Sequence, residues 1–442
     1  MSPGSPSRFF SLPSVFSSVL DSGLKVYVIQ RQELPLVSIH LIIPCGAEAD
    51  PPGRAGLAHL TAEMLTLGTQ KRSASQLAAE IDGLGASLSA ASGWNSTSLH
   101  LFGLSEDFQH LIDLLLEIYA EPAFSPEEFE QLKQRRLATL VQQKDESQII
   151  ADERFLELLF QGTPYDHPVY GTLKSLPALV CGESRDFYRR TFLPPGSLVV
   201  MAGDLEPEVC FRWAEDHFRS AVQGFQGLRQ EESSPPSLCG VRTILVDRPD
   251  LTQSQIRLGH VGIPHAHPDY VAFEVMNYIL GAGGFASRLM RKIRSELGYT
   301  YGIRGSLEPR KHSGPFTIST FTPTETTFPL VQEVFSVIRS FMAQGATDQE
   351  REEAVSFLTG SYPMKFETLS QMASRIIQAE LHELGLEYLA CYPDRVSAVS
   401  MEELARVART HIHPERMLIV VVGRVEKFRR EFEQLGPVEI RE

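Results

Sequence analysis

The sequence has few cysteines and no long apolar run, and both absences narrow the kind of protein that it encodes. None of its 442 residues lies in an uninterrupted apolar run of 18 or more, so a membrane-spanning helix is not expected. The five cysteines, Cys45, Cys181, Cys210, Cys239 and Cys391, form no CxxC pair. This spread argues against a disulfide framework or a cysteine-based zinc site, and it favours a reducing compartment.

Positive charge is also scarce. The chain has 41 Lys and Arg against 55 Asp and Glu, which gives a formal net charge of −14. A chain this acidic would approach phosphate groups against its own field, so nucleic acid is not an expected partner. The N-terminal segment 1–20 contains no sustained apolar stretch and no small-residue cleavage site. We therefore predict no secretory signal and expect a cytoplasmic protein.

The sequence does contain an internal repeat. Three pairs of segments match in order at a nearly constant spacing: 195–203 with 414–423, 125–128 with 347–350, and 147–148 with 370–371. The first pair shares a proline, a short polar stretch, a buried-strand run and a glycine. The second pair shares a Ser or Thr followed three residues later by Glu, which is a helix capping box. The repeat predicts two homologous domains, 1–221 and 241–442, joined by a polar linker at 222–240.

Each half mixes strand and helix patterns without strict alternation. In the first half, 24–30, 36–43 and 96–104 have strand patterns, whereas 56–67, 75–84, 108–119 and 126–143 have the periodicity of helices. Runs of strands and runs of helices on one chain favour an α+β fold. We expect each domain to be a mainly antiparallel sheet with helices packed on it.

The first candidate site lies in the helix predicted at 56–67. His59 and Glu63 are four residues apart and therefore share one helix face. A zinc peptidase helix needs two ligands at this spacing and a carboxylate just before the second ligand to accept a proton from metal-bound water. That position holds Ala62, which cannot act as a base. On spacing alone, a structural His–Glu pair is the simpler interpretation.

The surroundings of this pair resemble the inverted zinc motif of the pitrilysin/insulinase family of zinc metallopeptidases. The family motif reads His-x-x-Glu-His within a GxxHxxEHxxxxGT frame. The frame is present here as Gly56, His59, Met64, Gly68 and Thr69.

The resemblance implies a role for each position of the motif. His59 matches the first ligand, Ala62 stands at the catalytic glutamate position, and Glu63 stands at the second histidine position. The family's last ligand lies on the order of 75 residues further on, where this chain has Thr139. Three of the four positions are changed, so the resemblance implies the family fold, with two domains as a clamshell around a chamber. We expect no catalytic residue and no zinc in this chain alone.

A second segment, 281–301, resembles the family's GGxxSRLxxxxRxxxGLxY pattern. In the family, the arginine and the tyrosine of this segment reach the zinc site of the other half and bind the substrate. The matching positions here are Arg294 and Tyr301. Two other interpretations exist: a dinucleotide-binding loop at Gly281, although a helical pattern precedes it, or a structural role with Arg294 on an exposed helix face and Tyr301 in a core.

Two further features lie outside these motifs. The strand predicted at 88–95 follows Gly85-Ala86, and in the family the corresponding strand pairs with an extended peptide. The histidine pairs His265/His267 and His411/His413 lie beside prolines in predicted loops, and we interpret them as solvated, without a metal role.

The resemblance covers most of the chain, from Leu20 to Gly436, and fits the short, two-domain branch of the family. In that branch some members work as pairs, in which one chain has the zinc motif and the other keeps the arginine and the tyrosine. Our leading hypothesis is a non-proteolytic subunit that donates Arg294 and Tyr301 to a zinc-bearing homologous partner, with an extended peptide as substrate. The alternatives are a structural or peptide-binding member without a proteolytic role, and an atypical active peptidase that uses His59 and Glu63.

Overall fold

The computed structural model describes residues 12–191, 196–218, 234–236 and 238–441. The chain divides into two compact units. Unit 1 comprises Met1–Val141, His167–Glu232 and Pro363–Ala390, and unit 2 comprises Gln142–Asp166, Ser233–Tyr362 and Cys391–Glu442. The units differ from the contiguous domains 1–221 and 241–442 by two short segments, 142–166 and 363–390. Most of the predicted linker 222–240 lies outside the described residues.

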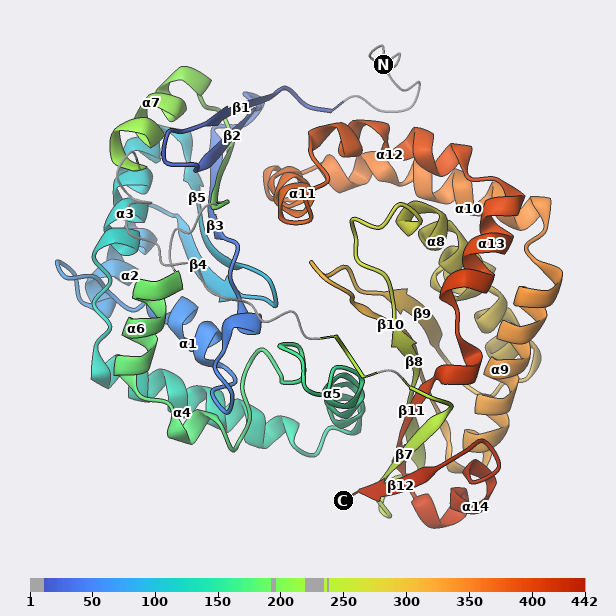
Figure 1. Cartoon of the computed structure of the whole chain (residues 1–442). Coiled ribbons are helices and arrows are strands. Elements are labelled where there is room, and N and C mark those ends of the chain that lie inside the picture. Colours follow the sequence, from blue (N-terminus) through green and yellow to red (C-terminus); the bar gives the residue numbers. More distant parts are fainter. Residues whose placement is uncertain (1–11, 192–195, 219–233, 237, 442) are drawn as a thin grey trace. The chain divides into compact units, whose positions relative to one another are not determined.

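Unit 1 contains a six-stranded mixed sheet in its described part (Figure 1). Its strands are β1 (Val15–Val19), β2 (Lys25–Gln30), β3 (Leu36–Ile43), β4 (Ser87–Ser92), β5 (Thr97–Leu104) and β6 (Leu198–Gly203). Its helices are α1 (Leu57–Met64), α2 (Ala74–Gly83), α3 (Phe108–Ala120), α4 (Pro126–Gln143), α6 (Cys181–Thr191), α7 (Pro207–Phe218) and α11 (Leu369–Leu381). Helix α12 (Leu386–Ala398) begins in unit 1 and ends in unit 2.

The main core of unit 1 lies between one face of the sheet and helices α1 to α4, α6 and α7. Strand β3 alternates, so that Val37, Ile39 and Leu41 enter this core, whereas Ser38 and His40 face the opposite side. On that opposite side α11 contacts β3 and β6. The sheet is therefore buried on both faces at its centre, as its almost continuous apolar strands require.

Unit 2 repeats this architecture. Its strands are β7 (Arg242–Asp247), β8 (Gln253–Val261), β9 (Ile303–Leu307), β10 (Pro315–Pro323), β11 (Leu418–Gly423) and β12 (Val438–Arg441). Its helices are α5 (Ser147–Leu159), α8 (Tyr270–Asn277), α9 (Thr327–Gln344), α10 (Asp348–Gly360), α13 (Met401–His411) and α14 (Arg429–Phe432). Helix α5 contacts β8 and β11, which explains why residues 142–166 belong to this unit (Figure 1).

The strand order supports the sequence repeat. Among the described residues, unit 1 has the order β1-β2-β6-β3-β5-β4 and unit 2 has the order β12-β7-β11-β8-β10-β9. Five strands correspond one to one, and β2–β6 and β7–β11 are the parallel pairs in corresponding positions. The paired segments 195–203 and 414–423 end in β6 and β11, which hold equivalent positions in the two sheets. The predicted α+β class with two homologous, mainly antiparallel units is confirmed.

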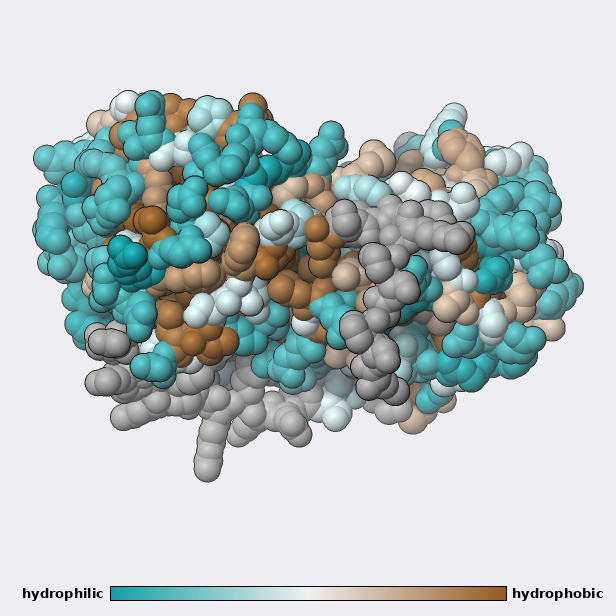
Figure 2. All heavy atoms as spheres, turned by 90° about the horizontal axis from the view of Figure 1, so that it is seen from above, coloured by the Kyte–Doolittle hydropathy of each residue, from teal (hydrophilic) through white to brown (hydrophobic). Residues whose placement is uncertain are grey.

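Figure 2 shows one face of the molecule coloured by hydropathy. Hydrophilic residues cover much of this face, and hydrophobic residues occur in groups between them. Among the described residues no helix is both long enough and apolar enough to cross a bilayer.

Candidate functional site

The start of α1 is fixed by a glycine and a partly buried carboxylate. Gly56 precedes α1 with a φ of +92°, and a Cβ atom there would lie 2.8 Å from the Cα atom of Gly171, so only glycine fits without strain. Asp50 accepts hydrogen bonds from the backbone N–H groups of Gly56 (2.8 Å) and Ala58 (2.7 Å). These bonds satisfy donors that have no partner within the helix, and they set the direction in which His59 points.

His59 and Glu63 do meet on one face of α1, and a third residue joins them. The Nε2 atom of His59 lies 3.4 Å from Oε2 of Glu63. The Nη2 group of Arg136, from α4, lies 2.5 Å from Nε2 of His59 and 2.9 Å from Oε1 of Glu63. Because a guanidinium only donates, His59 accepts at Nε2. One guanidinium nitrogen therefore engages both side chains that remain at the ligand positions of the motif.

Tyr170 completes this cluster. The Arg136 guanidinium lies 5.2 Å from the centre of the Tyr170 ring, within the range of a cation–π interaction. The rings of His59 and Tyr170 meet edge to face, with centres 4.8 Å apart. Arg136 is thus held by an imidazole, a carboxylate and an aromatic ring together.

Thr139, the position predicted from the family spacing, does not reach the cluster. Its hydroxyl donates to the carbonyl of Arg135 within its own helix. Arg136 lies three residues earlier, which is almost one helical turn, and therefore on a similar face of α4. The sequence signal was available as an arginine within one turn of the counted position. A count along the chain cannot fix the phase of α4 relative to α1, because loops and other elements separate the two helices.

The electrostatics of the cluster keep His59 neutral. Burial is the main cause that lowers the pKa of His59 to about 4; Glu63 opposes this shift, and the positive charge of Arg136 adds to it. The side chain is only 5% exposed. The pKa of Asp50 shifts in the opposite direction. Burial raises it to about 7, and the hydrogen bonds from Ala58 and Gly56 offset only part of this rise.

These residues lack the donor set of a catalytic zinc site. A catalytic zinc needs three protein ligands and a base near its water, and His59 and Glu63 are committed to Arg136 while Ala62 has no proton acceptor. A metal-ligating histidine nearly always donates its second ring N–H to an acceptor. Within the described part of the chain, Nδ1 of His59 is buried without a hydrogen-bond partner. The cluster is thus a cation–carboxylate–imidazole contact, and it offers no route to activate water.

The second candidate segment has an unusual backbone. Residues Tyr278–Ala282 and Met290–Glu296 form π-helices. Such helices are rare in proteins, and those that occur often lie at functional sites. Gly281 packs against β9, where a Cβ atom would lie 2.7 Å from the Gly305 nitrogen. A dinucleotide-binding loop follows a strand. Here Gly281 lies in a π-helix that follows helix α8, so the alternative of a dinucleotide-binding loop is wrong.

A buried carboxylate anchors this segment to α10. Arg288 donates to both carboxylate oxygens of Glu350, at 2.7 and 2.6 Å, and its guanidinium lies 4.9 Å from the centre of the Phe341 ring. Burial alone would raise the pKa of Glu350, but hydrogen bonds from Arg288 and Thr347 outweigh it and lower the pKa to about 2. Arg288 is therefore a structural residue of the motif, and Arg294 follows it in the same segment.

Arg294 and Tyr301 line one cavity of about 380 Å³ in unit 2, together with residues such as Gln253 and Thr322. Tyr301 is 78% exposed, so the alternative in which it fills a core is wrong. The Arg294 guanidinium lies 4.5 Å from the centre of the Phe285 ring. A cationic donor and a hydroxyl donor thus border the same open space.

Two threonines of β10 hold the chain on either side of Tyr301. The Thr322 hydroxyl donates to the carbonyl of Tyr299 (2.7 Å), and the Thr320 hydroxyl donates to the carbonyl of Gly302 (2.9 Å). Both threonines lie on one face of the strand, because they are two residues apart. These bonds fix the backbone that carries the tyrosine, which no local sequence pattern indicated.

The strand predicted at 88–95 is β4, and it lies at the edge of its sheet. It pairs with β5 on one side, and in the described part of the chain no strand pairs with its other side. Gly85 precedes it with a φ of +61°. Helix α1, which carries the degenerate motif, contacts this edge strand.

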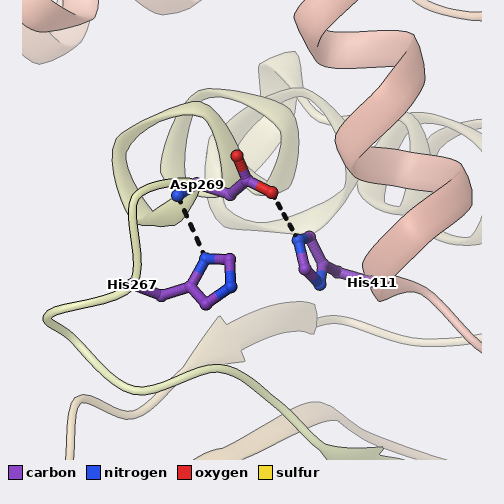
Figure 3. Close-up of side chains that lie close together, drawn as sticks. All are labelled: His267, Asp269 and His411. Atoms are coloured by element: carbon purple, nitrogen blue, oxygen red, sulfur yellow. Dashed lines mark hydrogen bonds and ion pairs between the residues drawn. The ribbon is translucent and has the colours of Figure 1, made fainter.

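The four histidines interpreted as solvated, His265, His267, His411 and His413, are all only partly exposed, and His411 is the clearest case. His411 ends α13, its side chain is 12% exposed, and its Nε2 lies 2.7 Å from Oδ2 of Asp269; the expectation of a solvated loop residue is wrong here. Figure 3 shows His267, Asp269 and His411 turned toward one another. Arg406 also donates to both oxygens of Asp269, at 2.8 and 2.6 Å. The carboxylate is thus already paired, and the cluster joins α13 to the start of α8.

Fold and site together define a class: a two-unit α+β chain whose helix α1 has only part of an inverted zinc motif. Comparison with family models agrees. Residues 25–173 match the model "Insulinase (Peptidase family M16)" and residues 178–358 match "Peptidase M16 inactive domain". The chain belongs to the M16 family.

Curated relatives carry two kinds of name. The chain is 26% identical over 408 residues to "Non-peptidase homolog YmxG" of Helicobacter pylori, covering 91% of this chain and 93% of that protein. It is also 26% identical over 371 residues to an "Uncharacterized zinc protease" of Rickettsia bellii, covering 84% and 86%. A crystal structure described as the peptidase M16 inactive domain from Pseudomonas fluorescens superposes with a TM-score of 0.85 at 24% identity, covering 92% of this chain and 98% of that one. This last likeness concerns the fold.

Proposed function

We propose that this chain is a non-proteolytic subunit of an M16 peptidase, which supplies Arg294 and Tyr301 to the peptide-hydrolysing site of a zinc-bearing homologous partner. The observation that carries the proposal is the contrast between the two candidate sites. The first has no base and no free ligand pair, whereas the second keeps both donors on one cavity.

The chemistry of the second site suits peptide binding. An arginine offers fixed donors to a peptide carbonyl or to the oxyanion that develops during hydrolysis, and a tyrosine hydroxyl adds a further donor. The free edge of β4 supports an extended peptide as the ligand, because it presents unpaired backbone groups to an added strand. The name of the Helicobacter pylori relative, a non-peptidase homolog, is consistent with a partner role. A cytoplasmic location stays a prediction.

The test is co-expression with a chain of the same family that has an intact His-x-x-Glu-His motif. Neither chain alone should cleave an extended reporter peptide, and the mixture should. Arg294→Ala should lower kcat/KM of the mixture by about a hundredfold or more, the typical loss when one oxyanion donor is removed, and leave complex formation unchanged. Arg291→Ala, which removes an arginine of the same segment that contacts Glu350 at 3.3 Å, is the matched control and should retain most activity.

Two outcomes would contradict the proposal. If Arg294→Ala cleaves as fast as the unmodified mixture, the arginine has no role in the reaction. If no zinc-motif homologue forms a complex with the chain, the alternative of a structural or peptide-binding member without a proteolytic role takes its place.

A further inference from the structure

We infer that the Arg136 guanidinium is a built-in cation that replaces the metal ion between α1 and α4 and excludes a divalent ion from His59 and Glu63. The inference concerns only unit 1. It deepens the proposed non-proteolytic role, but it does not depend on a partner or on Arg294 and Tyr301.

The guanidinium of Arg136 stands where a metal ion bound by His59 and Glu63 would lie. A zinc ion bound by His59 and Glu63 would lie about 2 Å from the imidazole nitrogen and from a carboxylate oxygen. The Nη2 group of Arg136 already lies 2.5 Å from Nε2 of His59 and 2.9 Å from Oε1 of Glu63. The same lone pair of His59 cannot serve an N–H donor and a metal ion, so the two occupants are mutually exclusive.

The positive charge of Arg136 also disfavours a divalent ion at this position. Arginine stays protonated at all accessible pH values, so the site always contains one positive charge beside the single negative charge of Glu63. A divalent ion would add two positive charges a few ångströms from a fixed cation, at a position where the neighbouring imidazole is almost fully buried. Repulsion is strong in such poorly screened surroundings.

The guanidinium cannot easily swing away. The Tyr170 ring lies over its face, and the His59 ring packs edge-on against the same tyrosine. The Arg136 side chain is only 20% exposed. Displacement would break two hydrogen bonds and a cation–π contact at once, and it would leave Glu63 without its cation.

Arg136 also connects two helices. His59 and Glu63 lie on α1, and Arg136 lies on α4, far from them in the sequence. A metal with ligands from both helices would tie them together, and the guanidinium makes the same tie without a metal. The inference therefore predicts that the fold of unit 1 is independent of zinc and sensitive to Arg136.

The experiment uses the full chain and measures zinc binding by calorimetry and by the shift of the melting temperature at pH 7. The unmodified chain should bind no stoichiometric zinc, and neither zinc nor a chelator should move its melting temperature. Arg136→Glu removes the cation and adds a carboxylate beside His59 and Glu63. This variant should bind zinc at least tenfold more tightly, with a zinc-dependent rise in melting temperature that the additional change His59→Ala abolishes.

Arg135→Glu is the matched control, because it makes the same charge change on an exposed neighbour in α4 and should gain no zinc binding. If Arg136→Glu does not fold, Arg136→Met keeps the apolar stem and removes only the guanidinium. That variant should melt at a lower temperature than the unmodified chain. Stoichiometric zinc in the unmodified chain that His59→Ala removes, a zinc response of Arg136→Glu no larger than that of Arg135→Glu, or an unchanged melting temperature of Arg136→Met would each overturn the inference.

Discussion

At the scale of single residues, one guanidinium group, that of Arg136 on α4, contacts both His59 and Glu63 on α1. The sequence shows which residues stand at the motif positions, but it does not show this contact. Ala62 and Glu63 could be assigned because they are local to one helix, and their spacing fixes their face. Arg136 could not, because its contact with His59 joins positions 77 apart in the chain. Chemistry that depends on a long-range contact needs the helix phase and the packing, which one sequence does not give.

A second long-range contact at this scale is a histidine pair in unit 1. His40 on β3 and His100 on β5 stack with ring centres 4.1 Å apart, and the Nε2 atoms of both lie 3.0 Å from the Ser38 hydroxyl oxygen. Burial is the main cause that lowers the pKa of His40 to about 3, and nearby His100 contributes. The folded state therefore holds His40 neutral.

This pair predicts a pH-dependent stability. Because the folded pKa of His40 lies below its unfolded value of 6.5, the folded state binds fewer protons, and the free energy of unfolding falls as the pH drops from 6.5 toward 3. Between pH 7 and pH 5 the loss from His40 is about 2 kcal/mol. Urea unfolding at pH 7 and pH 5 checks this. The free energy of unfolding of His40→Gln should fall by about 2 kcal/mol less over this interval than that of the unmodified chain. An equal loss in both proteins would contradict the burial argument.

At the scale of elements, the strands and the helix starts were predictable and the packing partners were not. Strand patterns at 36–43 and 96–104 match β3 and β5 closely, because alternation and apolar runs report burial directly. The capping box at Thr347 is formed as predicted, and the Glu350 carboxylate accepts a hydrogen bond from the Thr347 backbone N–H. By contrast, the apolar faces of α5 and α11 predict that these helices pack against other elements, but they do not indicate which of the two sheets each helix covers.

Glu350 also gives an element-scale prediction, because it joins α10 to the segment that carries Arg294. Its folded pKa of about 2 lies below the ordinary value of 4.5, so its contribution to stability is present above pH 4.5 and is lost as the pH falls toward 2. Glu350→Gln should lower the free energy of unfolding at pH 7 by about 3 kcal/mol. Urea unfolding at pH 7 and pH 3 checks this, and the difference from the unmodified chain should shrink at pH 3. The control Glu352→Gln, on an exposed position of the same helix, should change little.

At the scale of the whole molecule, two units of the same architecture carry different residues at their candidate sites. Both units have the same order of five strands, yet α1 has lost its metal-binding set, whereas the segment 281–301 keeps its arginine and tyrosine. The repeat was visible in the sequence because its buried central strands, β6 and β11, keep their pattern. The two discontinuous units were not visible, since they depend on where α5 and α11 dock.

The most direct test of the central claim is peptide cleavage by the purified chain alone, in the presence of added zinc. We expect no cleavage above the rate in buffer, because position 62 holds an alanine and His59 and Glu63 on α1 both contact Arg136. Cleavage by this chain alone that a chelator stops and that His59→Ala abolishes would contradict it.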